Sequence, residues 1–308
     1  MISGLAPGCP CGCTKGAEGI MPSSPYGGRM PLLDGRWGSM GRRRAFGRCA
    51  SDRSGLDALA QAGSAQAGSV WPAGFRAAIS LSFDDARPSQ IRHGAPVLER
   101  LGVASTFFVL PSALAADRRA WAGMVERGHE IGNHTVHHPC SAGMGWSSSR
   151  SLQALSLGDM RRELLAASAQ IRRLLGVDPW VFAYPCGQTF VGRGTETQSY
   201  VPVVAELFGV GRTFNDKWAN SPARCDLAQV ACISSDDVSF QALRPKLEET
   251  AEGGGWLVLG GHEVGENSDF ETTAVGTLEA VVRWCREQAI WIDTVGAIGR
   301  RIASTSVE

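Results

Sequence analysis

From residue 77 onward, the chain alternates short β-like runs with longer stretches whose apolar residues recur at helical spacing. The short runs are rich in β-branched and aromatic residues and lie at 77–83, 105–110, 130–132, 180–184, 210–214, 229–233, 256–259 and 290–292. The helical stretches lie at 88–101, 112–127, 157–175, 240–251 and 273–288. Strands that alternate with helices predict an α/β fold with a mostly parallel sheet, either a barrel or doubly wound. Both architectures gather functional groups at the carboxyl ends of the strands.

The first 70 residues have a different character. They are rich in glycine and show no apolar periodicity. Such a composition cannot bury enough apolar surface to offset the entropy lost on ordering. We therefore predict a disordered or poorly ordered segment over residues 1–70, followed by one folded domain over 71–308.

Charge and hydropathy exclude two classes of partner. The net charge is zero and the pI is near 7.0, so neither nucleic acid nor an anionic membrane surface is expected as a partner. No run of 18 apolar residues is present, so no membrane-spanning helix is expected. Residues 43–46 (RRAF) resemble the core of a twin-arginine export signal, but Asp52, Arg53 and Asp57 occupy the place of its apolar region. A cytoplasmic location is therefore favoured over export, and the oligomeric state is left open.

The nine cysteines do not form a recognisable structural zinc site. Cys9, Cys11 and Cys13 have C-x-C-x-C spacing rather than paired C-x2-C spacing, and no second half-site follows. We interpret them as mostly free thiols and do not favour a redox or metal role for this cluster. Cys225 and Cys232 are close enough in sequence to form a disulfide if the protein is exported.

Polar residues gather directly after three predicted strands. Asp84 and Asp85 follow the run at 77–83, His134 and His138 follow the run at 130–132, and His262 follows the run that begins at 256. These positions meet at one edge of a parallel sheet. The sequence therefore predicts that the five side chains form one site.

The two histidines and one aspartate suit a catalytic divalent metal. Three protein ligands of this kind leave coordination positions open for water and substrate. Pro139 disfavours a helical conformation for His138, so we expect a loop to present His134 and His138. Asp85 can supply the carboxylate, and Asp84 is then free to act as a base if the charge of the metal keeps its pKa low.

Each element also has a simpler interpretation. An Asp-Asp pair after a strand is commonly a turn or a helix cap, and an H-x3-H pair is commonly packed or exposed histidine. His137 can replace either neighbour as a ligand, or it can face solvent or support the ligands. His93 and His129 flank helices, and we assign them to structure.

Four motifs in order resemble those of the NodB-like polysaccharide deacetylases, carbohydrate esterase family 4. Residues 82–86 (SFDDA) resemble the first motif, 134–139 (HTVHHP) the second, 182–187 (FAYPCG) the third and 257–262 (LVLGGH) the last. The resemblance extends from about residue 77 to 302. It implies a distorted (β/α) barrel of about seven repeats and a polysaccharide deacetylase catalytic domain over 71–308.

The resemblance also implies a role for each residue of the site. Asp85, His134 and His138 would hold the metal, with zinc expected first and cobalt or nickel as alternatives. Asp84 would be the general base for a metal-bound water that attacks the acetyl carbonyl. His262 would protonate the departing amine, which is a poor leaving group unless it is protonated.

The third motif would supply the remaining groups. A backbone N–H near Cys186 would stabilise the tetrahedral oxyanion together with the metal, which requires preorganisation rather than a particular side chain. Tyr184 and Pro185 would line the same loop. Residues 234–238 (SSDDV) would correspond to a further motif of the family, and its Asp237 would be available to orient His262.

Two positions depart from the family pattern. Ala183 stands where many members have an arginine that contacts the catalytic aspartate, so we expect Asp84 to lack this partner and the pH optimum to shift upward. Val238 stands where a tryptophan is usual, so the groove should stack sugar rings differently. Trp218 is either an alternative platform for sugars or, as we favour, a buried core residue.

These residues predict a metal-dependent hydrolase that removes acetyl groups from an N-acetylated or O-acetylated amino sugar or polysaccharide. The expected ligand is a glycan or an acetylated small molecule. Two alternatives stay open: hydrolysis of a small non-sugar amide or cyclic imide, and a carbohydrate-binding pseudoenzyme. An intact base, three metal ligands and an acid favour an enzyme, because a binding protein does not need all five.

Overall fold

The computed structural model describes residues 70–144, 150–267 and 269–305. The predictions made for residues 1–69, including the thiols of Cys9, Cys11 and Cys13 and the export-like run at 43–46, lie outside the described residues. No helix in these three ranges is long and apolar enough to cross a membrane.

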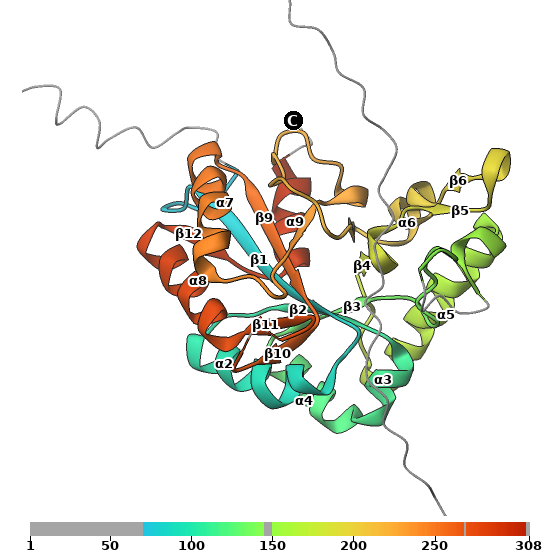
Figure 1. The fold of residues 1–308 in the computed structure, drawn as a ribbon, viewed down its shortest axis with the longest axis horizontal. Helices are drawn as coiled ribbons and strands as arrows, with labels where there is room; N and C mark the ends of the chain where they lie inside the picture. The colour runs from blue at the N-terminus through green and yellow to red at the C-terminus, as the bar shows by residue number, and fades with distance from the viewer. Residues whose placement is uncertain (1–69, 145–149, 268, 306–308) are drawn as a thin grey trace, which may run out of the picture. The chain divides into compact units, whose positions relative to one another are not determined.

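A parallel sheet forms the centre of the domain (Figure 1). Its strands are β1 (Ala77–Asp84), β2 (Thr106–Val109), β3 (Glu130–Asn133), β4 (Val181–Ala183), β7 (Val210–Arg212), β8 (Cys232–Ser234), β9 (Trp256–Gly261) and β12 (Ile290–Ile292). Their order is β7-β4-β3-β2-β1-β9-β8, and β12 pairs with the beginning of β1. A parallel bridge between Arg212 and Val230 links the two ends of this order, so the sheet is a nearly closed barrel. The predicted barrel of about seven repeats is confirmed, and the doubly wound alternative is wrong.

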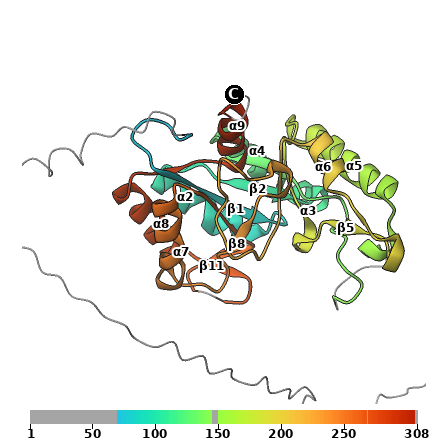
Figure 2. The same ribbon diagram turned by 90° about the horizontal axis from the view of Figure 1, so that it is seen from above.

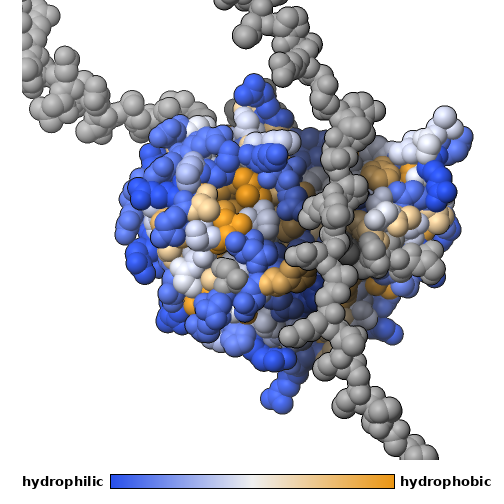
Figure 3. Space-filling model, in the orientation of Figure 1, coloured by the Kyte–Doolittle hydropathy of each residue, from blue (hydrophilic) through white to orange (hydrophobic). Residues whose placement is uncertain are grey.

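Helices surround the barrel, as Figures 1 and 2 show. They are α2 (Ala95–Leu101), α3 (Pro111–Ala116), α4 (Arg118–Glu126), α5 (Leu157–Leu175), α6 (Val201–Leu207), α7 (Phe240–Gly253), α8 (Val275–Glu287) and α9 (Val295–Thr305). A π-helical turn, Gln90–Gly94, precedes α2. Two small sheets, β5 (Phe190–Val191) with β6 (Gln198–Ser199) and β10 (Glu263–Gly265) with β11 (Thr272–Ala274), lie outside the barrel order. The surface in Figure 3 is largely hydrophilic, with smaller hydrophobic patches.

One predicted helix is divided in two. The stretch 112–127 breaks at Asp117, whose φ of −140° is not helical. The carboxylate of Asp117 accepts a hydrogen bond from the backbone N–H of Ala120 and caps α4. The apolar spacing runs through both helices, because both pack against the same side of the barrel.

The alternation of side chains along the strands divides the core. Successive residues of a strand point to opposite faces. In β1, Ile79, Leu81 and Phe83 therefore pack in the outer cluster beneath the helices, while Ala78 packs in the inner cluster. By the same alternation, Asp84 faces the interior at the carboxyl end of β1.

Small residues make room inside the barrel. A Cβ atom added to Gly132 would lie 2.4 Å from Cδ1 of Phe108 and 2.9 Å from Cγ2 of Val181. At Gly260 it would lie 2.6 Å from the Sγ atom of Cys232. The interior is thus closely packed around these glycines.

We expect Gly132→Ala to destabilise the domain by about 1–3 kcal/mol, because the methyl group overlaps the fully buried ring of Phe108. Urea denaturation measures the change. Gly276→Ala in α8 is the matched control, since a Cβ atom there meets nothing within 4 Å. In a helix this control should be neutral or stabilising by up to about 1 kcal/mol. Equal stabilities of the two variants would contradict the described packing.

Candidate metal and catalytic site

The carboxyl ends of three barrel strands bring the predicted side chains together. Asp84 ends β1, His134 directly follows β3, and His262 directly follows β9. Asp84 and His134 are buried, and their side chains lie 4.0 Å apart between Oδ2 and Nε2. Asp85 lies in the turn after β1 with a positive φ of 73°, which turns its side chain out of the strand alternation.

Three candidate ligand atoms converge at this edge. Oδ1 of Asp85 lies 3.6 Å from Nε2 of His134 and 3.8 Å from Nε2 of His138. Oδ2 of Asp85 accepts a hydrogen bond from Arg87, but buried Oδ1 has no hydrogen-bond partner. A buried carboxylate oxygen without a partner is costly, and a divalent cation would satisfy it. The carboxylate and the two imidazoles thus fit a metal ion and would leave it open coordination positions.

The hydrogen bond of His134 and the burial of His138 both favour this arrangement. His134 hydrogen-bonds through Nδ1 to the carbonyl oxygen of Ala183 at 2.9 Å, which directs Nε2 toward Asp85. Burial and the neighbouring His134 lower the pKa of His138 to about 4. His138 is therefore neutral at pH 7, which is the form that binds a metal.

The segment that carries these histidines is a loop, as predicted from Pro139. Thr135 and His138 have positive φ angles of 68° and 49°, so the loop is not helical. Side chains of the loop hold it: Oδ1 of Asn133 accepts from the backbone N–H of Thr135, and Oγ1 of Thr135 accepts from that of His138.

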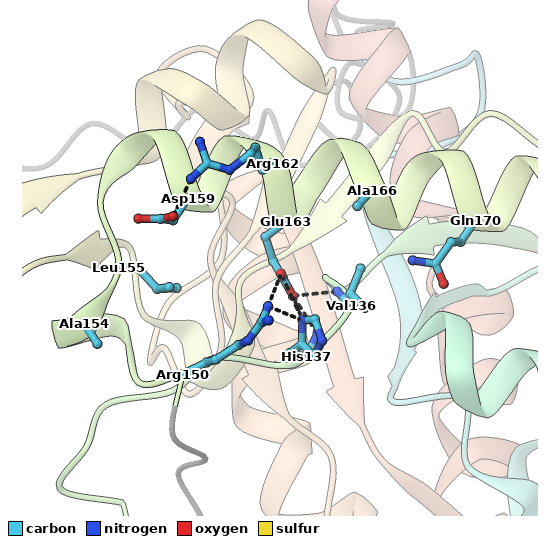
Figure 4. A pocket seen from close by; sticks show the side chains of 10 residues that line it. All are labelled: Val136, His137, Arg150, Ala154, Leu155, Asp159, Arg162, Glu163, Ala166 and Gln170. Carbon is cyan, nitrogen blue, oxygen red and sulfur yellow. Dashed lines mark hydrogen bonds and ion pairs between the residues drawn. The ribbon is translucent and has the colours of Figure 1, made fainter.

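Glu163 of α5 holds the same loop from its other side. Its Oε1 accepts hydrogen bonds from the backbone N–H groups of Val136 and His137, at 3.0 and 2.6 Å. The ring of His137 also turns to Glu163, with Nδ1 2.9 Å from Oε1 (Figure 4). This contact lies in a pocket of about 500 Å³ against α5. His137 therefore contacts Glu163 and supports the loop, whereas the candidate ligand group consists of Asp85, His134 and His138.

Asp84 forms a buried ion pair with Arg212 of β7, which we did not predict. The guanidinium contacts Oδ1 of Asp84, and both side chains are almost completely excluded from solvent. Burial alone would raise the pKa of Asp84, but the positive charge of Arg212 outweighs it and lowers the pKa below its usual 3.8. The expectation that Asp84 lacks a cationic partner is wrong, and the upward shift of the pH optimum that was expected from it loses its basis.

Arg212 replaces the arginine that is missing at position 183 from the neighbouring strand. In the register of β4 and β7, Arg212 pairs directly with Ala183. Its guanidinium lies over the rings of Phe108 at 4.6 Å and Phe214 at 5.4 Å. These aromatic faces compensate in part for the lost hydration of the cation.

His262 is paired with Asp236, not with the predicted Asp237. Nδ1 of His262 lies 2.6 Å from Oδ2 of Asp236, and the backbone N–H of His262 donates to Oδ1 at 3.0 Å. Burial opposes protonation, but this hydrogen bond and the charges of Asp84 and Asp236 raise the pKa of His262 to about 9. Asp237 is exposed and instead binds the loop before β11 by accepting from the N–H of Glu271.

Gln90 links the strands of Asp84 and His262. Its side-chain amide donates to the backbone carbonyl oxygens of Asp84, at 2.6 Å, and of His262, at 2.8 Å. Gln90 is fully buried and begins the π-helical turn after β1. Sequence reasoning missed it, because a buried glutamine has no local signature.

The predicted residues of the third motif take different positions relative to the site. Tyr184 is buried in a peripheral cluster, and its hydroxyl donates to the carbonyl of Ala228, so it does not face the site. Pro185 is buried and opens the short turn that carries Cys186. Cys186 has a positive φ of 54° and forms a disulfide with Cys140.

Two other expectations are corrected. Cys225 and Cys232 are free thiols and do not pair.

Trp218 is 58% exposed and is not a core residue. Its loop bridges through Asn220 to Trp256, the first residue of β9. His129 is buried and accepts from the N–H of Ser105, which agrees with its structural assignment.

Comparison with known proteins identifies the domain. Residues 75–198 match the family model described as polysaccharide deacetylase. A curated relative, the uncharacterized protein YlxY of Bacillus subtilis, is 29% identical over 92 residues, which is 30% of this chain. The chain spans about a quarter (25%) of the length of that relative.

The same fold occurs among solved structures. A protein of Mycobacterium smegmatis described as a polysaccharide deacetylase has a TM-score of 0.59 and 15% identity, covering 77% of this chain and 94% of that one. A mutant form of the peptidoglycan deacetylase PdaC of Bacillus subtilis has a TM-score of 0.49 and 17% identity, covering 74% and 92%. The likeness to the Mycobacterium smegmatis structure shows the fold, and the family match over residues 75–198 agrees with the resemblance found in the four motifs.

We expect Arg212→Met to lower the free energy of unfolding by about 3–5 kcal/mol, because it leaves the buried carboxylate of Asp84 without its partner. Guanidinium denaturation measures the loss, and a double-mutant cycle with Asp84→Asn isolates the coupling. The control is Arg161→Met, which breaks the exposed pair with Glu206 and should cost no more than about 1 kcal/mol. Similar losses of unfolding free energy in both variants would show that the buried pair contributes no more to stability than the exposed pair.

Proposed function

We propose that this chain, whose residues 75–198 match the polysaccharide deacetylase family, is a metal-dependent hydrolase that removes acetyl groups from an N-acetylated or O-acetylated amino sugar or polysaccharide. The observation that carries this proposal is the orphaned oxygen of Asp85, which lies within 4 Å of both His134 and His138. Zinc is the expected ion, with cobalt or nickel as alternatives. When bound, the ion would polarise the acetyl carbonyl and lower the pKa of a water molecule.

Asp84 is proposed as the general base. Arg212 engages Oδ1, and Oδ2 is the oxygen that faces His134 at 4.0 Å. Because the pKa of Asp84 is below its usual value, the carboxylate is ionised at neutral pH and can accept a proton from the attacking water. Arg212 holds the carboxylate in this orientation.

His262 is proposed as the general acid. With a pKa of about 9 it is protonated at neutral pH, so it has a proton to give to the departing amine. Asp236 fixes Nδ1 and leaves Nε2 as the donating atom. The backbone N–H of Cys186 is proposed to stabilise the oxyanion, since its loop follows β4 at the same edge of the barrel.

The substrate is proposed from the domain and is the part most open to test. Val238 provides no aromatic platform for a sugar ring, and Trp218 is an exposed tryptophan. Acetate release should be screened with acetylated chitooligosaccharides, peptidoglycan fragments, acetylxylan and small amides, with zinc, cobalt and nickel each supplied. Activity on small amides or imides alone would favour the second hydrolase class. Glycan binding without bound metal or turnover would favour a pseudoenzyme.

Asp84→Asn should retain metal and lose about 10²–10⁴-fold in kcat, because the amide keeps an acceptor for Arg212 but cannot take a proton. Asp85→Asn should instead lose metal affinity. Metal content by atomic spectroscopy, together with acetate release, separates the two. Thermal unfolding serves as the control for folding. Loss of metal from Asp84→Asn with retention in Asp85→Asn would reverse the two roles.

Asp236→Asn should move the alkaline limb of the kcat/KM profile to lower pH, because the pKa of His262 falls from about 9 toward 6.5. The raised pKa also adds stability. This contribution is fully present below pH 6.5 and is lost as the pH rises through about 9. The stability difference between wild type and variant should therefore shrink over that range. An unmoved alkaline limb would exclude His262 as the acid.

A further inference from the structure

The Cys140–Cys186 disulfide lies directly against a residue of the proposed metal group. It joins the loop after His138 to the turn after β4. The Sγ atom of Cys140 is 3.6 Å from Nδ1 of His138. None of the proposed catalytic steps uses either sulfur atom.

The imidazole of His138 stands between two groups of potential ligands. Nε2 faces Oδ1 of Asp85 at 3.8 Å, and Nδ1 faces the Cys140 sulfur. The candidate ligand atoms of His138, Cys140 and Cys186 all lie within 4.8 Å of one another. A disulfide sulfur is a neutral and weak donor, whereas a thiolate is a strong metal ligand, so this second group can hold an ion only after the disulfide is reduced.

We propose that reduction of this disulfide creates a second metal site, formed by Nδ1 of His138 and the sulfurs of Cys140 and Cys186, for a thiophilic divalent ion such as zinc. Two thiolates and one imidazole form a known zinc ligand set that leaves a fourth position open. This second site shares His138 with the proposed hydrolytic group but needs neither Asp85 nor His134.

The geometry requires little movement. With zinc–nitrogen distances of about 2.0–2.1 Å and zinc–sulfur distances of about 2.3 Å, neighbouring nitrogen and sulfur ligands of a tetrahedron lie about 3.5 Å apart. The observed separation of Nδ1 and the Cys140 sulfur is 3.6 Å. The two sulfurs have to separate to about 3.8 Å in the same tetrahedron. The Cys186 sulfur has to settle at about 3.5 Å from Nδ1, starting from a position within 4.8 Å of it.

The two loops stay together when the disulfide is open. The backbone N–H of Ser141 donates to Oε1 of Gln188 at 2.8 Å, which joins the same two loops. Gln188 is itself fixed, since its carbonyl accepts from the hydroxyl of Tyr200. The cysteines therefore remain neighbours as thiols.

A dithiol can serve as the reductant of the Cys140–Cys186 disulfide. The dithiol supplies two electrons and two protons, the Cys140–Cys186 bond breaks to two thiols, and the dithiol becomes a disulfide. Binding of one zinc ion then releases the two thiol protons to solvent. Because a neutral imidazole binds one ion through one nitrogen, an ion at this site withdraws His138 from the group with Asp85 and His134.

Cobalt titration of the full-length, metal-free protein tests the proposal. The protein is reduced with a dithiol, the reductant is removed under anaerobic conditions, and thiolate-to-cobalt charge transfer is followed in the near ultraviolet. The reduced protein should gain this absorption at about one cobalt per chain, and the oxidised protein should not. Zinc should displace the cobalt.

Variants identify the ligands. Cys140→Ser and Cys186→Ser should each lower the cobalt affinity of the reduced protein by about 100-fold or more, because mutation of groups that only support the ligands already costs about 10–100-fold. Cys225→Ser and the combined Cys9→Ser/Cys11→Ser/Cys13→Ser variant should keep the signal. His134→Ala should also keep it, which separates this site from the proposed hydrolytic one. Persistence of the full signal in Cys140→Ser or Cys186→Ser, or its absence from the reduced wild type, would overturn the proposal.

Discussion

A carboxylate in the interior of a barrel is tolerable only with a cation beside it, and the ion pair of Asp84 and Arg212 meets that condition. The alternation of β1 directs Asp84 inward, so the carboxylate cannot escape to solvent without breaking the strand pairing. Arg212 in turn needs space and aromatic faces, which Phe108 and Phe214 provide. The glycines of the inner wall belong to the same arrangement, because larger side chains would displace these rings. The buried polar site and the packing of the barrel interior therefore depend on the same residues.

Local patterns in the sequence were sufficient for most of the fold. Helix α5 spans the predicted stretch 157–175 because its ends carry strong signals: a capping box of Ser156 and Asp159, and Gly176 in the left-handed conformation. The carboxyl ends of the strands were equally predictable, since a polar residue that follows a buried apolar run marks the end of the strand. Asp84, Asp85, His134 and His138 meet as expected, while their chemical roles remain proposals. Pro139 was enough to predict a loop rather than a helix for the histidines.

What the sequence did not reveal depends on contacts between distant elements. The partner of Asp84 comes from 128 residues away, and the local pattern at 210–214 could only have shown an arginine in an otherwise buried run. Asp236 and Asp237 are indistinguishable in a one-dimensional reading, and only the backbone geometry after β8 directs the first toward His262. The Cys140–Cys186 pairing likewise follows from the meeting of two loops rather than from cysteine spacing.

The hydrogen bonds of Gln90 have a consequence for how this scaffold can change. The proposed base and acid are carried by β1 and β9, which pair along six residues of β1, and the amide of Gln90 ties the two carbonyl groups just at the ends of that pairing. The strand pairing and the amide of Gln90 thus fix the spacing of the two backbone positions that carry the proposed proton acceptor and proton donor. A substrate with a differently placed leaving group cannot be served by moving one strand against the other. Changes in substrate range must therefore arise in the surrounding loops, while the reaction geometry stays constant.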